Sequence, residues 1–170
     1  MLVASVDGCR AGWFVILREL GSDRSSRVLE SFSLVARLPE CPPIVAVDIP
    51  IGLLEQAERG GRECDRRTST ARMPRRNSVF NPPVRGALFG STFEQACATN
   101  AERSPIQSRI SRQCFGLFPM LREFDELMSP DLQVLIHELH PEVCFFELNR
   151  CKRMLYGKHT TRAFETGSMF

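Results

Sequence analysis

The stretch PPIVAVDIPIGL, residues 42–53, limits the folds open to this chain more than any other part of the sequence. Ile44 to Val47 is apolar throughout and β-branched at three of its four positions, as expected of a strand that is covered on both faces. Pro50 and Gly52 end the strand, because proline cannot donate a ladder hydrogen bond and glycine favours a turn. We therefore expect a central strand of an α/β sheet, and this strand ends in an acid, Asp48.

The N-terminus repeats this pattern of an apolar strand that ends in an acid. Leu2 to Val6 predicts a short strand that leads into Asp7, and Trp13 to Leu17 predicts a second one. The residues DGCRAG between them predict a hairpin loop, so two antiparallel strands open the fold. Val28 to Leu38 predicts either a third strand or a strand that runs into a helical turn.

Length and composition indicate how the remaining chain is organised. With 170 residues, 43% of them hydrophobic, the chain can bury a core, and we expect a single domain over residues 1–170. Residues 55–90 are rich in Arg, Ser, Pro and Gly, which predicts an irregular insertion after the fourth strand. The insertion is basic within a chain of net charge +2, because eight arginines from Arg59 to Arg85 face only Glu63 and Asp65.

Local signals predict helices and one more strand in the second half of the chain. Ser91 and Glu94 form a candidate capping box for a helix that ends near Arg103. A second helix is expected over residues 108–128, broken near Gly116 and Pro119. The last two expected elements are a strand over Leu132 to Ile136 and a helix that starts at Pro141.

The cysteines and the N-terminus bear on the compartment. The seven cysteines are odd in number, widely spread and never spaced as C-x-x-C, which fits neither a disulfide framework nor a zinc ribbon. We expect reduced, mostly buried thiols. Asp7 lies where a signal peptide needs its apolar core, and no apolar stretch approaches the ~20 residues of a membrane span. We therefore expect a cytoplasmic protein without a membrane anchor.

The acids at strand ends suggest a chemistry. Asp7 and Asp48 each follow a strand, and a third expected strand leads into Glu138, His140 and Glu142. Sites in open α/β sheets form beyond the carboxyl ends of strands, so these side chains can converge. Clustered carboxylates suit Mg²⁺ or Mn²⁺, which can support phosphodiester hydrolysis. Taken singly, however, an Asp after a strand is more often a turn former or a helix cap.

Other residues allow both a functional and a structural interpretation. Gly8, beside Asp7, would let a substrate backbone approach closely. His140 is either a ligand or proton carrier, or only a hydrogen-bonded side chain. A zinc site of His140, Cys144 and Cys151 matches no recurring finger spacing. Arginines of the insertion can bind phosphate, yet the whole chain prefers Arg to Lys, and such side chains are commonly only solvated.

Seven short motifs, in this order, resemble a known family, the predicted RNase H-like nucleases grouped as domain of unknown function 429. They span nearly the whole chain and read VDGCRAGW (6–13), DIPIGL (48–53), RECD (62–65) with AR (71–72), SVFNPPVR (78–85), SRQCFGLFP (111–119), EFD (123–125) and ELHPE (138–142). The resemblance implies an RNase H-like fold: a mixed five-stranded sheet with its first three strands antiparallel, helices on both faces, and acids gathered at strand ends.

The resemblance also implies roles for residues. Asp7 and Asp48 would be the acids of the first and fourth strands, and Glu142, or else Glu138, the next metal ligand. The remaining motif residues would serve substrate binding: Gly8, Trp13, Arg62, Asp65, Arg72 and Arg85.

The chain departs from the family pattern at two places. Met120 stands where the family usually has Lys, and the acid-bearing helix expected after LYGKHTT is absent from this sequence. The second metal would then lack a ligand, and an uncovered apolar face would favour a homodimer.

Three functions follow as hypotheses. The leading one is a divalent-metal-dependent nuclease, with Asp7, Asp48 and Glu142 as ligands and Arg62, Arg72 and Arg85 steering the phosphate backbone. The alternative is a catalytically inactive nucleic-acid or partner-binding module on the same fold. A third is a site for a nucleotide or another small phosphorylated ligand, for which the sequence offers no adenine-pocket signature.

Overall fold

The computed structural model describes residues 1–19, 21, 23–70, 82–106 and 109–151. Arg72, in the predicted substrate-binding set, and all residues after Cys151 lie outside this part of the chain.

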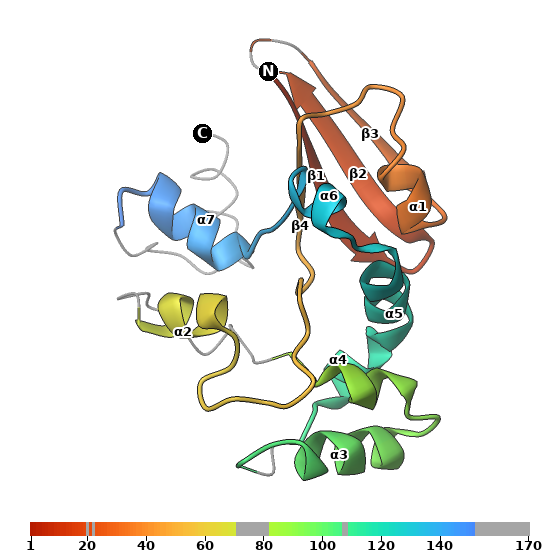
Figure 1. Cartoon of the computed structure of the whole chain (residues 1–170). Helices are drawn as coiled ribbons and strands as arrows, with labels where there is room; N and C mark the ends of the chain where they lie inside the picture. The colour runs from red at the N-terminus through yellow and green to blue at the C-terminus, as the bar shows by residue number, and fades with distance from the viewer. Residues whose placement is uncertain (20, 22, 71–81, 107–108, 152–170) are drawn as a thin grey trace.

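The fold is built on one mixed sheet of five strands in the order β3-β2-β1-β4-β5 (Figure 1). The first three strands are antiparallel, whereas β4 runs parallel to β1 and β5 runs parallel to β4. This confirms the predicted α/β class with a mixed sheet. The strands are β1 (Leu2–Cys9), β2 (Gly12–Glu19), β3 (Arg24–Leu29), β4 (Ile44–Val47) and β5 (Ile136–Glu138).

The first hairpin is longer than the sequence predicted. The ladder between β1 and β2 continues to the pair Cys9 and Gly12, so the predicted six-residue loop shrinks to Arg10 and Ala11. Gly12 makes this continuation workable, because its φ is +123° and a Cβ there would lie 2.2 Å from the carbonyl oxygen of Leu29. Gly12 of the VDGCRAGW motif therefore allows β2 to pack closely against the end of β3.

Most helices of the described residues lie between β4 and β5, whereas α1 (Phe32–Val35) comes before β4 and α7 (Pro141–Leu148) after β5. Apart from a 3₁₀ helix, η2 (Arg85–Phe89), the others are α2 (Glu63–Thr70), α3 (Phe93–Glu102), α4 (Arg112–Gly116), α5 (Phe118–Leu127) and α6 (Pro130–Gln133). The break between α4 and α5 and the helix start at Pro141 agree with the sequence prediction.

Two local predictions were wrong in detail. The helix cap lies one residue later than expected, because the Thr92 hydroxyl accepts from the Gln95 amide while the Gln95 side chain accepts from the Ser91 amide. Of the strand predicted over Leu132 to Ile136, only Ile136 is strand, because residues 132–133 belong to helix α6 and residues 134–135 form a turn. Ser129 caps that helix with its hydroxyl and Pro130 starts it, so β5 begins only at Ile136.

The main core lies on one face of the sheet. Alternate residues of β1 and β2 point to this face, and α1 and α5 cover it (Figure 1). Trp13, Phe32 and Phe124 form its aromatic centre, with the Phe32 ring centroid 4.8 Å from that of Trp13 and 4.6 Å from that of Phe124. Trp13 is only 1% exposed, so this motif residue belongs to the core.

The opposite face is covered only in part. The predicted two-sided burial of the fourth strand is confirmed, because Val45, Ala46 and Val47 are all buried although they alternate between faces. The cross-strand neighbours Phe14 and Val28, by contrast, are 38% and 48% exposed. Helix α7 lies on the other side of the sheet from α1 and α5 (Figure 1).

The cysteines are all free, which agrees with the expectation of reduced thiols. They are not mostly buried, however, because Cys114 is buried while Cys9, Cys41, Cys64 and Cys151 are exposed. In the part of the chain that the structure describes, no helix combines the length and the apolar character needed to cross a membrane.

Candidate functional site

Asp7 and Asp48 come together where the parallel pairing of the two central strands ends, although Asp7 itself lies within β1, which continues to Cys9. Strands β1 and β4 run parallel with Val6 opposite Val47, and the Asp48 amide donates to the Val6 carbonyl over 3.2 Å. The two acids thus follow directly on paired positions. Since side chains alternate along a strand, both belong to the face opposite the aromatic core, and both residues are exposed. We call Asp7 and Asp48 the acid pair.

The loop after Asp48 is held at Ile51 by a clamp. The Ile51 amide donates to Glu138 Oε2 over 2.8 Å, and the Ile51 carbonyl accepts from Arg62 Nη1 over 2.6 Å. Arg62 also donates to both carboxylate oxygens of Glu138, over 2.7 and 2.8 Å. Glu138, predicted as a catalytic residue or ligand, therefore connects the end of β5 to the loop beside the acid pair.

The clamp is anchored in helix α2 through Asp65. Arg62 Nε and Nη2 donate to the two Asp65 oxygens over 2.9 and 2.7 Å, and the Arg62 amide also donates to Asp65. With its bonds to Glu138 and Ile51, all five guanidinium N–H groups have acceptors. Burial lowers the pKa of Arg62, but the hydrogen bonds to Asp65 and Glu138 outweigh it and raise that pKa above its ordinary value. In this arrangement Arg62 and Asp65 bind each other rather than a substrate.

Helix α7 begins close to the end of β4 and therefore to the loop that carries Asp48. The Leu139 amide donates to the Val47 carbonyl over 2.9 Å, so the chain enters α7 beside the end of β4. His140 is the N-cap residue of α7, Glu142 lies in its first turn, and both are half-buried. Burial, and after it the charge of the Asp48 carboxylate, raise the pKa of the Cys144 thiol.

The structure thus provides two acids side by side, but no preformed cage. Among the described residues, no group of three or more His, Cys, Asp or Glu side chains is placed to hold a metal ion. The predicted third ligand, Glu142, does not join the acid pair in such a group, and neither do His140 and Cys144.

Gly8 and Arg85 have local partners. A Cβ on Gly8 would lie 2.6 Å from Met120 Cε, so the Met120 side chain covers the backbone next to Asp7. Arg85 donates to Asp125 through Nε over 2.8 Å and to Glu55 through Nη1 over 2.9 Å. Hydrogen bonds to Asp125 are the main cause that raises the pKa of Arg85.

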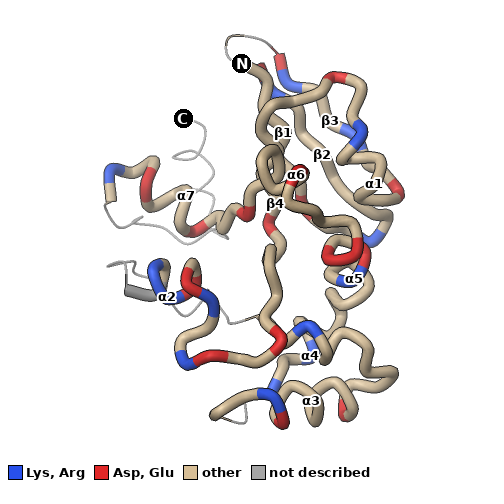
Figure 2. The backbone as a smooth tube through the Cα atoms, in the orientation of Figure 1, with Lys and Arg blue, Asp and Glu red and all other residues tan. Residues whose placement is uncertain are grey.

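The basic insertion is largely neutralised by acids in the described part of the chain. Arg66 pairs with Glu58 and Glu63 at 2.7 and 2.9 Å, and Arg67 pairs with Glu63 at 2.8 Å. Figure 2 shows the result, with Lys or Arg and Asp or Glu positions side by side along α2 and acidic positions near the end of β4 and along α7. Among the described arginines of the insertion, those at positions 62, 66, 67 and 85 are therefore paired with acids.

Sequence reasoning missed the roles of two acids in the EFD motif. Glu123 accepts from Trp13 Nε1 over 3.0 Å and from the Phe32 amide over 2.5 Å, whereas Asp125 binds Arg85. Two residues apart on a helix, they point in different directions. The spacing of two residues could have indicated that the acids of EFD, which lie on α5, bind two different parts of the chain and do not bind one ligand together.

The effect of the Asp48 charge on the Cys144 thiol gives a first testable prediction. We expect Asp48→Asn to speed alkylation of Cys144 at neutral pH, because loss of the carboxylate removes one cause of the raised thiol pKa and the thiolate is the reacting form. Quantitative mass spectrometry of the Cys144 peptide measures the rate, and the Cys114 peptide is the internal control, because burial alone raises its pKa, to about 11. An unchanged Cys144 rate with a folded variant would contradict the placement of α7.

The comparisons with known proteins bear on family membership. A family model described as "Protein of unknown function (DUF429)" matches residues 6–166, nearly the whole chain. No curated protein matches the chain, and no solved structure does. With a match that runs from the first strand through α7 and beyond, the chain belongs to the DUF429 family.

Proposed function

We propose that this protein is a divalent-metal-dependent nuclease on an RNase H-like fold, with the acid pair at its centre. The observation that carries the proposal is the register of β1 and β4, which sets Asp7 and Asp48 next to each other directly after the last parallel pair, Val6 and Val47. The sheet order, with three antiparallel strands followed by two parallel ones, supports the RNase H-like part. The charge of two adjacent carboxylates is what a bound cation would relieve.

The residues present fit Mg²⁺ or Mn²⁺ held jointly with a substrate. The acid pair supplies hard oxygen donors, and Mg²⁺ is commonly bound by one or two carboxylates together with waters and substrate phosphates. Because the described residues provide no third ligand beside the pair, we assign the pair one weakly held ion. When bound, the ion would offset negative charge on the phosphate oxygens during hydrolysis.

The chain's own residues would hold and orient this site. Asp7 and Asp48 would hold the ion from two strands that are hydrogen-bonded to each other, which keeps the spacing of the two residues constant. The clamp on Ile51 restrains the loop that follows Asp48. His140 and Glu142, at the start of α7, are the proposed carriers of the proton between water and the leaving oxygen.

A cleavage assay tests the proposal. We expect purified protein with Mn²⁺ to cut labelled single-stranded, duplex or hybrid nucleic acid, and Asp7→Asn to reduce the rate by about a hundredfold or more, because one ion ligand is lost. Asp131→Asn is the matched control, since Asp131 is an exposed acid on helix α6. Cleavage that survives Asp7→Asn and Asp48→Asn would show a contaminant or a wrong site.

Metal binding can be measured without any substrate. We expect millimolar Mn²⁺ to raise Tm by a few degrees at neutral pH, because an ion at about ten times its Kd stabilises by ~1.4 kcal/mol. We expect the gain to shrink on acidification, because protons compete with the ion for its ligands. Scanning calorimetry with and without Mn²⁺ measures the change in Tm at neutral pH and at lower pH. If Asp48→Asn leaves the Mn²⁺ shift unchanged, the ion binds elsewhere.

The alternative function is a nucleic-acid or partner-binding module without catalysis. Its supporting observation is that the described residues gather two acids rather than three. Substrate binding without cleavage, unaffected by Asp7→Asn, would favour it.

The third hypothesis, a nucleotide site, would show as a thermal shift with nucleotides and Mg²⁺. The exposed free thiols support a reducing, cytoplasmic setting for the protein. The homodimer stays a prediction, which light scattering tests by measuring the molar mass in solution.

A further inference from the structure

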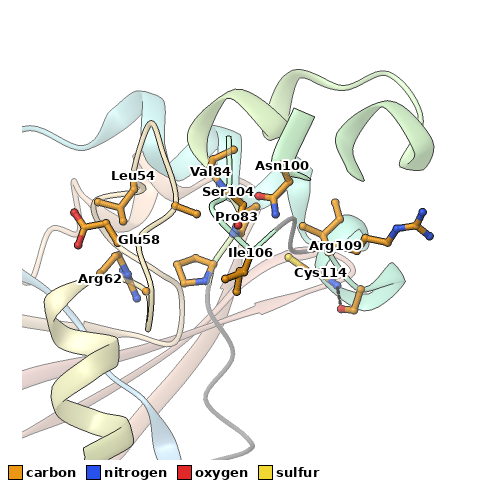
Figure 3. A pocket seen from close by; sticks show the side chains of 15 residues that line it. Leu54, Glu58, Arg62, Pro83, Val84, Asn100, Ser104, Ile106, Arg109 and Cys114 are labelled. Atoms are coloured by element: carbon orange, nitrogen blue, oxygen red, sulfur yellow. Dashed lines mark hydrogen bonds between the residues drawn. The ribbon is translucent and has the colours of Figure 1, made fainter. Parts of the chain in front are cut away.

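A separate cavity of about 230 Å³ lies away from the acid pair. Its walls come from the loop after β4, the segment before η2, and the stretch from the end of α3 to α4. Figure 3 shows Leu54, Glu58 and Arg62 on one side of it and Asn100, Ser104 and Cys114 on the other. Of the residues assigned to the candidate site, it contains Arg62 alone.

Long-range hydrogen bonds hold the three walls together. The Arg85 amide donates to the Leu54 carbonyl, the Ala57 amide to the Arg103 carbonyl, and the Val84 amide to Asn100 Oδ1, each over 2.8 Å. Each bond joins two different walls. The cavity is therefore formed before a ligand arrives, as binding sites usually are.

The buried lining of the cavity combines apolar and neutral polar side chains with one cation, Arg62, whereas the charged residues Glu58 and Arg109 of the lining are exposed. Pro83, Val84 and Cys114 are buried in it beside the amide of Asn100 and the hydroxyl of Ser104. Burial raises the pKa of the Cys114 thiol to about 11, so this side chain is uncharged at neutral pH. The guanidinium of Arg62 donates all its N–H groups to Asp65, Glu138 and Ile51 and offers none to an anion.

We propose that this cavity binds a neutral, planar heterocycle of the size of a single nucleobase. Its volume lies below the ~300 Å³ at which pockets for drug-sized ligands begin, which favours a single ring system over a whole nucleotide. Apolar walls with a few polar groups are the surroundings in which proteins hold an extruded base. The choice of a base, rather than another heterocycle, rests on the proposed function.

Arg62 links this cavity to the acid pair. The same side chain lines the cavity and holds the carbonyl of Ile51, three residues after Asp48. A base in the cavity and the loop beside the acid pair therefore contact one rigid group. Such a base would fix the position of a substrate strand relative to the acids.

Saturation-transfer NMR on the full chain tests the cavity. The probes are uracil and orotate, which share one pyrimidine ring and differ by a carboxylate. We expect transfer to uracil and none to orotate, because the cavity offers a carboxylate no unengaged buried cation. Absence of uracil, cytosine and adenine binding at millimolar concentration, or equal binding of orotate, would overturn the proposal.

A pair of size-matched variants locates the binding. We expect Ala57→Leu, on the cavity wall, to weaken uracil binding by about tenfold or more, because the added carbons occupy ligand space. Ala98→Leu adds the same carbons at an exposed position of α3 and leaves binding unchanged. If both variants melt near the wild type and bind uracil equally, the site is elsewhere.

Two further measurements complete the test. The first distinguishes a base within a strand from a free base, and the second distinguishes failure of the cavity proposal from failure of the nuclease proposal. Displacement of uracil by a short oligonucleotide identifies a base within a strand as the ligand, and failure to displace it identifies a free base. Asp7→Asn should keep uracil binding. Uracil binding without cleavage would therefore contradict only the nuclease, whereas cleavage without any base binding would contradict only the cavity's assignment.

Discussion

Replacing Arg62 with Gln is expected to lower the free energy of unfolding by about 3 kcal/mol or more, because it breaks a buried ion network while its acids remain. Arg62 is 6% exposed and binds Asp65, Glu138 and the Ile51 carbonyl. A glutamine amide cannot reach all of these acceptors or compensate two carboxylates. Urea denaturation followed by circular dichroism measures the difference.

The control for this prediction lies on the neighbouring helix. Arg67 pairs with Glu63 but its side chain is 80% exposed, so Arg67→Gln should change stability by no more than about 0.5 kcal/mol. Arg62→Lys, which keeps the charge but not the forked geometry, should fall between the two. Equal stability of Arg62→Gln and Arg67→Gln would mean that the clamp does not hold the loop after Asp48.

Gly12→Ala should destabilise the fold by at least about 2 kcal/mol, because two costs coincide at this position. The φ of +123° is unfavourable for a residue with a Cβ, and that Cβ would lie 2.2 Å from the Leu29 carbonyl oxygen and 2.9 Å from Glu30 Cα. Both neighbours are backbone atoms, so relief requires β2 and β3 to separate. Thermal unfolding gives the loss directly.

Two other glycines serve as controls that distinguish the cost of backbone strain at Gly12 from the cost of the steric contact with Leu29. Gly52 has a φ of +73°, and a Cβ there would meet no atom within 4 Å, so Gly52→Ala reports backbone strain alone. Gly116 has neither constraint, and Gly116→Ala at the end of α4 should be neutral or slightly stabilising. A Gly12→Ala loss no larger than that of Gly52→Ala would refute the close contact with Leu29.

The features that sequence reasoning predicted are those encoded locally. The apolar β-branched run of β4 could be identified because few other structures accommodate it, and Asp48 followed from the strand's end. That Asp7 lies beside Asp48 also followed, because acids at the ends of adjacent parallel strands share one edge. Strand periodicity and strand ends thus sufficed for the centre of the candidate site.

The features that could not be predicted depend on partners far away in the chain. Arg62 and Arg85 look like phosphate ligands in isolation, yet Glu138 and Asp125 lie 76 and 40 residues further on. The family resemblance suggested a substrate-binding role for Trp13, but its indole N–H donates to Glu123, 110 residues away. No local pattern reveals such pairings. The late start of β5 was missed for a local reason. The Ser129 side chain caps helix α6, and this cap outweighs the strand propensity of the residues that follow.

The pairing order of the strands bears on when the acid pair comes into being during folding. The antiparallel ladders from β1 to β3 join neighbours in sequence and close through short connections, so the segment with Asp7 can form early. Asp48 is brought beside it only when the parallel β1 and β4 ladder closes, and β5 must then dock from some ninety residues further along the chain. Closing such distant contacts is slow. We therefore expect the two carboxylates to come together only after the antiparallel strands have formed, so that their mutual repulsion arises when part of the stabilising contacts already exists.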